Sequence, residues 1–145
     1  MITVTFNNIP ISEGQLLSKA YARLPIDLDW DMEDGVYYTV IIYDVDGPFP
    51  SSPEYPYCHY LAVNVTASYG RGDDIITYAP PNPPNGDHPH TYYIDIYTQY
   101  GKTYPDYDIN YIRPQFDIDS FVTRHNLDLF DQTYFLVKPD KIPSN

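Results

Sequence analysis

The segment VYYTVIIYDV (residues 36–45) is the longest run of β-branched and aromatic residues in the chain, and it predicts a buried strand. The flanking segments ITVTF (residues 2–6) and IDLDW (residues 26–30) alternate apolar and polar residues, so each places its apolar side chains on one face of a strand. Three further strands are predicted at CHYLAVNV (58–65), TYYIDIYTQ (91–99) and TYFLV (133–137). Alternation of period two therefore dominates the chain.

Helical periodicity is scarce. Residues 12–24 show it weakly, whereas residues 116–130 show it more clearly, with Asp117 as a capping residue and Asp119 as a negative charge in the first turn. The apolar residues of this helix expected to face the core are Phe116, Phe121 and Leu127. The sequence thus predicts a mainly β fold, a Greek-key antiparallel β-sandwich with one short helix.

Length and charge restrict the function. A chain of 145 residues predicts a single domain spanning 1–145, with 137–145 as a polar tail. Asp and Glu number 20 against 8 Lys and Arg, for a formal net charge of −12. A field of that sign repels phosphate backbones and anionic lipid surfaces, so nucleic-acid binding and stable membrane insertion are not expected. Any anionic ligand needs a local positive site.

Cysteine usage and the N-terminal residues indicate a cytoplasmic protein. Cys58 is the single cysteine, so no intrachain disulfide is available to the fold. The segment MITVTFNN carries no basic and apolar leader pattern, and no apolar run approaches the roughly 18 to 20 residues that span a bilayer. If the chain is viral, we expect the host cytoplasm or the virion.

Polar side chains that could form a site gather at three predicted strand ends. Asp44 and Asp46 follow the longest strand, His59 opens the next, and His90 with Tyr92 opens a third. Proline-rich loops precede the last two strands, at residues 47–57 and 79–89. Proline fixes the backbone without regular structure, which suits a rigid pocket wall. If the strands are neighbours, their ends converge.

A purely structural interpretation competes with this one. An Asp-x-Asp-Gly-Pro segment is by itself most often a turn, and a single histidine beside an apolar strand more often packs than binds. The order of the pieces favours the functional interpretation. YTVIIYDVDGPFPSSPEYPYCHYLAVNV followed by YAPPNPPNGDHPHTYYIDIYTQ resembles the phosphatidylethanolamine-binding protein family, which includes the Raf kinase inhibitor protein and plant flowering-time regulators.

The resemblance runs from about Ile2 to Val137 and implies site residues. The family's Asp-Pro-Asp-x-Pro block falls on Asp44, Asp46 and Pro48, and its strand-opening histidine falls on His59. The second block supplies the remaining positions: Asn82 in the pocket loop, the Pro-Pro-x-Gly run at Pro83, Pro84, Asn85 and Gly86, and then His90 and Tyr92. The resemblance implies that Asp44, His59, His90, Tyr92, Asn82 and Pro84 contact a ligand, with Asp46, Pro48, Pro83 and Gly86 as support.

Some positions depart from the family pattern. Val45 stands in place of proline, Cys58 in place of histidine, Thr91 in place of arginine and Asn82 in place of glycine. The C-terminal helix that caps the pocket in the animal members is expected to be absent, which implies a more open site.

Three functions of different classes follow from these residues. The first is a non-catalytic module that binds a small anion or a phospholipid headgroup such as phosphoethanolamine, with His59, His90 and Tyr92 donating hydrogen bonds to it. Asp44 then either orients and protonates a histidine or meets a ligand ammonium. The second is an inhibitor or scaffold with a kinase or protease as partner. The third is a metal-dependent enzyme using Asp44, His59 and His90; we expect no metal, no cofactor and no catalysis.

Overall fold

The computed structural model describes residues 1–46, 56–105 and 111–142, so Pro48 lies outside the described part of the chain. The elements follow one another as β1 (Thr3–Phe6), β2 (Ile9–Ile11), β3 (Leu16–Ser18), α1 (Lys19–Ala22), β4 (Ile26–Asp29), β5 (Tyr37–Asp44), β6 (Tyr57–Val65), β7 (Asp73–Ile76), β8 (His90–Gln99), α2 (Ile118–Arg124) and β9 (Asp128–Lys138). The mainly β prediction is confirmed, and α2 is the predicted helix.

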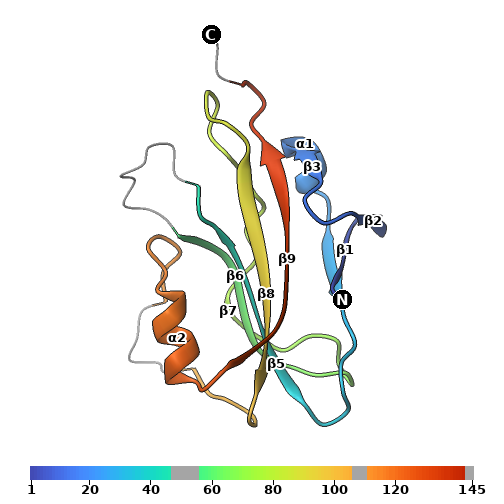
Figure 1. Ribbon diagram of the computed structural model, residues 1–145, viewed down its shortest axis with the longest axis vertical. Coiled ribbons are helices and arrows are strands. Elements are labelled where there is room, and N and C mark those ends of the chain that lie inside the picture. The colour runs from blue at the N-terminus through green and yellow to red at the C-terminus, as the bar shows by residue number, and fades with distance from the viewer. Residues whose placement is uncertain (47–55, 106–110, 143–145) are drawn as a thin grey trace.

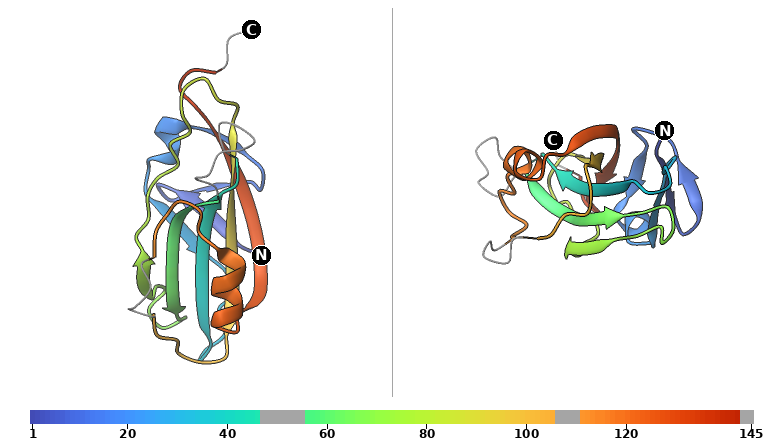
Figure 2. Two further views of the ribbon diagram at one scale, coloured as in Figure 1. Left: turned by 90° about the vertical axis from the view of Figure 1, so that its left-hand side faces the viewer. Right: turned by 90° about the horizontal axis from the view of Figure 1, so that it is seen from below.

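Two sheets make up the sandwich. The small sheet has the strand order β2-β1-β4, and the large sheet has the order β3-β9-β8-β5-β6-β7. Strands β5 and β6 are consecutive, but β8 joins the far side of β5 and β9 follows it, which gives the crossed connections of the predicted architecture. Figures 1 and 2 show the small sheet against one face of the large sheet and α2 on the other side. One pairing departs from the antiparallel prediction, since β3 lies parallel to β9.

The main core lies between the sheets. Ile2, Val4 and Phe6 are buried from the small sheet, as the alternation in residues 2–6 predicted. From the large sheet they meet, among others, Tyr92 and Phe135. Ile26 and Leu28 of β4 share this inward face but are only half-buried. The small sheet therefore does not close completely over its partner.

A second, smaller core lies under α2 on the opposite face of the large sheet. The Asp117 side chain caps α2 by accepting a hydrogen bond from the Ser120 backbone N–H at 3.1 Å, and this bond holds the pKa of Asp117 below its usual value. The three apolar residues predicted to face the core are all buried there: Phe116, Phe121 and Leu127. None of the helices in the described ranges is long and apolar enough to cross a bilayer.

Some elements differ from the predictions. The short strands β2, β3 and β7 were not predicted and lie at sheet edges. Of residues 12–24, where helical periodicity was weak, only the single turn α1, capped by Ser18, is helical, whereas residues 16–18 form β3. Strand β9 runs from Asp128 to Lys138, whereas the sequence predicted only Thr133–Val137. Its first residues are exposed and alternate weakly, so only pairing with β8 extends the strand that far.

Candidate functional site

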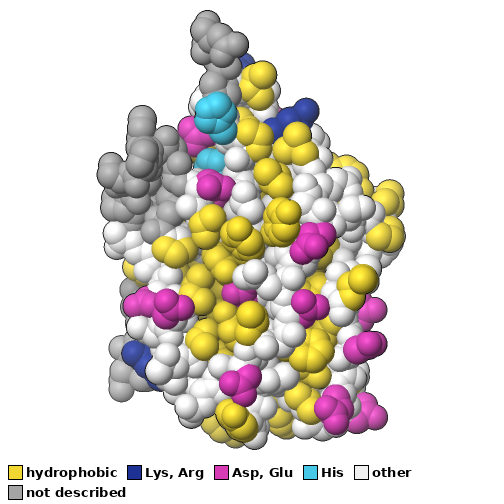
Figure 3. Space-filling view, viewed as in Figure 1, with side chains coloured by type: hydrophobic (Ala, Val, Ile, Leu, Met, Phe, Trp, Pro, Cys, Tyr) yellow, Lys and Arg dark blue, Asp and Glu magenta, His cyan; other side chains and the backbone are white. Residues whose placement is uncertain are grey.

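Strand pairing brings the three predicted strand ends together. Asp44, the last residue of β5, lies opposite Tyr57 of β6 on one side and Tyr92 of β8 on the other. His59 follows Tyr57 on β6, and His90 opens β8. Because β5 lies between β6 and β8, Asp44 sits at the centre of this rim. Figure 3 shows histidine and acidic side chains side by side at the end of the molecule nearest the C-terminus.

His90 is held between two carboxylates. Its Nδ1 lies 2.7 Å from Asp44 Oδ2, and its Nε2 lies 3.0 Å from Asp87 Oδ2. The Asp44 and His90 side chains are each 3% exposed. Burial by itself lowers the pKa of His90, but the hydrogen bonds and negative charges of Asp44 and Asp87 outweigh it, so the pKa lies above its usual value. A protonated His90 donates from both ring nitrogens.

His59 is in a different state. Its Nδ1 lies 2.7 Å from the backbone carbonyl oxygen of Ala79, an atom that only accepts, so Nδ1 carries the proton. Burial lowers the pKa of His59, with the Ala79 bond and the Asp44 charge opposing the shift. The neutral ring therefore presents Nε2 as an acceptor. The two histidines of the rim thus have complementary hydrogen-bonding roles.

Tyr92 forms the wall between the two histidines. Its ring is fully buried and stacks on Phe135 at 5.6 Å and on His90 at 6.5 Å between centroids. The His59 ring meets it edge-on at 5.2 Å. Tyr92 thereby joins the rim to the main core.

Asp46 connects the end of β5 to the start of β8. Its carboxylate accepts a hydrogen bond from the Thr91 backbone N–H at 2.6 Å, and its own backbone N–H donates to Asp44 Oδ1 at 2.8 Å. The turn after β5 thus fixes Asp44 relative to His90. The Thr91 residue that donates this backbone hydrogen bond stands where the family carries arginine.

The proline-rich loop before β8 is fastened to the C-terminal segment. Gly86, at φ +92°, donates its N–H to the Lys141 carbonyl at 2.8 Å, and the Lys141 N–H donates to Asn85 Oδ1 at 3.1 Å. Asn82 and Pro84, which were expected to contact a ligand, are exposed, whereas Pro83, which was expected to support the pocket, is buried. The loop is therefore held by backbone bonds as well as by its prolines.

Two residues that the sequence did not single out complete the rim, namely Asp87 and Lys141. The sequence signal for Asp87 is its position three residues before His90. Its contact with the ring depends on the turn of the loop, in which the Asp87 N–H donates to the Pro84 carbonyl at 3.2 Å. Lys141 carried no signal, because its contacts use only backbone atoms of a segment predicted to be a polar tail.

The donor set does not form a metal centre in the described ranges of the chain, where no three ligating side chains converge closely enough to hold an ion. Cys58 belongs to the second core, and burial raises the pKa of its thiol to about 12. His59 instead faces Tyr92, so thiol and imidazole lie in different environments. The rim thus places a His90 ring held by two carboxylates beside a neutral His59 ring.

Comparisons with known proteins agree with this fold. Residues 6–135 match the family model of the phosphatidylethanolamine-binding protein. The protein TWIN SISTER of FT from Arabidopsis thaliana is 31% identical over 85 residues, which cover 57% of this chain and 46% of that protein. The protein MOTHER of FT and TFL1 homolog 2 from Oryza sativa subsp. japonica is 28% identical over 136 residues, covering 88% of this chain and 75% of that protein.

A solved structure gives the same fold. A carboxypeptidase Y inhibitor, determined in complex with its cognate proteinase, superposes with a TM-score of 0.77 at 19% identity and covers 96% of this chain and 83% of its own. The family model covers residues 6–135, which is most of the chain. The chain therefore belongs to the phosphatidylethanolamine-binding protein family.

Proposed function

We propose that this protein is a non-catalytic binding module that holds a small anion or a phosphorylated headgroup at His90 and acts as a regulator. The observation that carries the proposal is the 3.0 Å contact between His90 Nε2 and a carboxylate oxygen of Asp87. A buried imidazolium that already holds one oxyanion through Nε2 is suited to hold another. A phosphate oxygen would take the position that Asp87 occupies.

The state of His59 narrows the ligand class. Because His59 Nδ1 donates to Ala79 and the pKa of the ring is lowered, its Nε2 accepts a hydrogen bond and does not donate one. The ligand should then offer an anionic oxygen to His90 and a donor to His59. Hydrogen phosphate has both in one group, and phosphoethanolamine adds an ammonium.

Asp44 supports anion binding through His90 despite its own negative charge. Its 2.7 Å contact with Nδ1 fits the role of a carboxylate that orients a histidine and keeps it protonated. The absence of catalysis in the proposal is supported by Cys58, whose buried thiol has a raised pKa. We place the action of the protein in the cytoplasm, with which a lone unpaired thiol is in keeping.

The test is a titration with inorganic phosphate and with phosphoethanolamine, followed by NMR of the His59 and His90 rings. In the wild type we expect saturable shifts at millimolar ligand. Asp87→Asn removes the competing carboxylate and should tighten phosphate binding by about tenfold or more, since a charge-assisted hydrogen bond no longer has to be displaced. Asp119→Asn, an exposed carboxylate on α2, is the matched control and should change nothing.

The proposal fails if neither the wild type nor Asp87→Asn shows saturable shifts. Equal phosphate affinity in wild type and Asp87→Asn would also count against it, because the anion would then bind without displacing Asp87. A His90→Gln variant should lose the response to both ligands.

A second candidate function is inhibition of, or scaffolding for, a protein partner such as a protease or kinase. It is favoured by the structural match to a carboxypeptidase Y inhibitor solved with its proteinase and by relatives named after flowering regulators. A net charge of −12 favours a basic partner surface. Carboxypeptidase Y activity at increasing concentrations of this protein tests it directly. Saturable inhibition retained in His90→Gln would assign the effect to the outer surface.

A further inference from the structure

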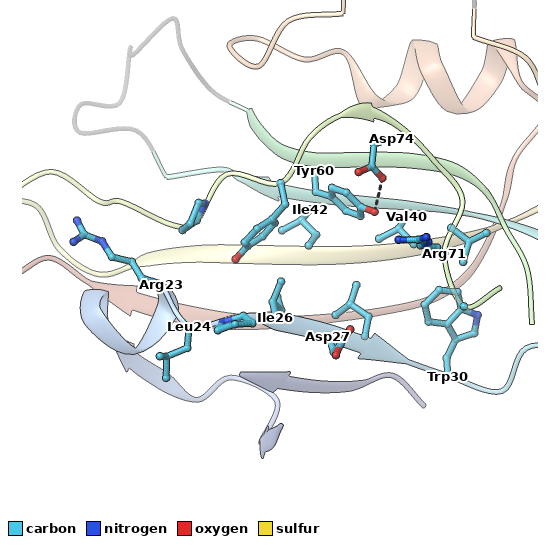
Figure 4. A pocket seen from close by; sticks show the side chains of 16 residues that line it. Arg23, Leu24, Ile26, Asp27, Trp30, Val40, Ile42, Tyr60, Arg71 and Asp74 are labelled. Atoms are coloured by element: carbon cyan, nitrogen blue, oxygen red, sulfur yellow. Dashed lines mark hydrogen bonds between the residues drawn. The ribbon is translucent and has the colours of Figure 1, made fainter. Parts of the chain in front are cut away.

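A cleft of about 510 Å³ lies between the small sheet and the large sheet, away from the His90 rim. Ile26 of β4 lines one wall, and Val40 and Ile42 of β5 line the other (Figure 4). None of Asp44, His59 and His90 lines it. Its volume lies within the range of sites that hold small organic ligands, roughly 300 to 1,000 Å³.

The walls of the cleft are incompletely packed. Val40 and Ile42 are 3% and 1% exposed, but Ile26 and Leu28 opposite them are only half-buried although they point to the same core. Sandwich interiors normally interdigitate to the density of an organic crystal. Here part of the apolar surface of β4 is left uncovered by the residues that the structure describes.

Two polar groups of the lining are also left without acceptors. The Tyr78 hydroxyl and the Trp30 indole N–H are buried, and neither has a hydrogen-bond partner among the residues the structure describes. Trp30 as a whole is 7% exposed. The neighbouring Tyr60 differs, because its hydroxyl donates to Asp74 at 2.8 Å. A buried donor without an acceptor is costly and is normally satisfied by something bound.

The charges at the cleft favour an acid. Figure 4 shows Arg23 and Arg71 at opposite ends of it. Neither guanidinium forms a salt bridge within the described ranges, in a chain with only 8 Lys and Arg. Of the two carboxylates of the lining, Asp74 already accepts the Tyr60 bond. The unused hydrogen-bonding capacity of the cleft thus consists mainly of donors.

We propose that this cleft is a second ligand site and binds a small aliphatic acid, an apolar chain that carries a carboxylate. The chain would cover the exposed sides of Ile26 and Leu28 against Val40 and Ile42. The carboxylate would accept a hydrogen bond from the Tyr78 hydroxyl, with an arginine at the end of the cleft supplying the counter-charge. The site is independent of anion binding at His90.

Trp30 gives a direct measurement, because it is the single tryptophan of the chain and it lines the cleft. The probe is decanoate, titrated below its micelle concentration while the emission of Trp30 is recorded. We expect a saturable change. Tyr78→Phe should weaken decanoate about fivefold, the effect of one net hydrogen bond. Tyr60→Phe is the matched control, since its hydroxyl is already used, and should stay within about twofold.

Further measurements test which ligand charge the site prefers and where the site lies. Decylammonium should bind much more weakly than decanoate, and inorganic phosphate, the probe of the His90 site, should not displace decanoate. Ile26→Phe fills the cleft from a half-buried position and should abolish the response, with circular dichroism checking that the variant is folded.

Three results would overturn the proposal. One is a response that does not saturate or is unchanged in folded Ile26→Phe. Another is equal binding of decylammonium and decanoate, which would remove the case for an acid. The last is equal weakening by Tyr78→Phe and Tyr60→Phe, which would show that the free hydroxyl has no special role.

Discussion

The His90 rim and the inter-sheet cleft satisfy their polar groups in opposite ways. Both ring nitrogens of His90 meet protein carboxylates, at 2.7 and 3.0 Å. In the cleft, the Tyr78 hydroxyl and the Trp30 N–H are buried without a partner in the described part of the chain. A ligand of the rim must displace a protein group, whereas a ligand of the cleft enters space that the protein leaves unfilled. Affinity at the rim therefore depends on the cost of displacing a protein carboxylate from His90. Affinity at the cleft depends on the contacts that the ligand adds.

The largest expected effect comes from the ring that ties the rim to the small sheet. Phe135 is fully buried, stacks on Tyr92 at 5.6 Å and meets Phe6 edge-on at 5.4 Å. Phe135→Ala should lower the free energy of unfolding by about 3–5 kcal/mol, measured by urea denaturation. Phe130→Ala, at a side chain 42% exposed, should cost about 1 kcal/mol or less. Equal losses would show that Phe135 does not anchor the rim.

Next in size is the removal of the buried carboxylate from the rim. Asp44→Asn removes the negative charge closest to His90, so the pKa of His90 should fall and stability should drop by about 3 kcal/mol. Asp87→Asn should shift the pKa in the same direction by less, since the Asp87 side chain is 16% exposed. NMR titration of the His90 ring measures both pKa values. A larger shift from Asp87→Asn would reverse the assignment of the dominant partner.

A smaller contrast is expected between the two tyrosines of the cleft. Tyr60→Phe loses a hydrogen bond to Asp74 and should cost about 0.5–1 kcal/mol of unfolding free energy. Tyr78→Phe removes a buried hydroxyl that has no partner in the described ranges, so stability should stay unchanged or rise. Thermal denaturation of the ligand-free protein checks both. A clear loss in Tyr78→Phe would mean that this hydroxyl is already satisfied.

The smallest effect is the pH dependence of stability. The raised pKa of His90 stabilises the fold below the usual imidazole pKa of about 6.5, and this contribution is lost as pH rises through the folded value. The lowered pKa of His59 has the opposite effect. Its contribution to the stability of the fold is complete above about pH 6.5 and is lost as the pH falls through the pKa of the folded state. Urea midpoints across this range should decline on both sides, and His90→Gln should flatten the alkaline side alone.

The sequence predicted the central strands well because each carries a strong local pattern. Alternation placed Ile2, Val4 and Phe6 in the core, and the Asp117 cap identified α2. The edge strands β2, β3 and β7 were not predicted, because they are short and take their conformation from a neighbouring strand. Their existence depends on pairing, which local patterns do not report.

The candidate site could be predicted only in part, for a related reason. Residue types and order pointed to Asp44, His59 and His90, and strand pairing does bring them together. The Asp87 contact depends on how a loop turns, and the neutral state of His59 depends on a carbonyl twenty residues away. The cleft was beyond prediction, since Ile26 and Leu28 alternate in the same way whether or not the opposite wall reaches them.

The two bonds that join the proline-rich loop to Lys141 have a thermodynamic consequence. The loop that they hold also carries Asp87, the group that competes for His90. A molecule that binds the segment after β9 and breaks these bonds would change how readily Asp87 leaves His90, and with it the phosphate affinity. Linkage is reciprocal, so phosphate bound at His90 would change the affinity of that molecule for the segment by the same factor. The segment after β9 would then report on whether the rim is occupied.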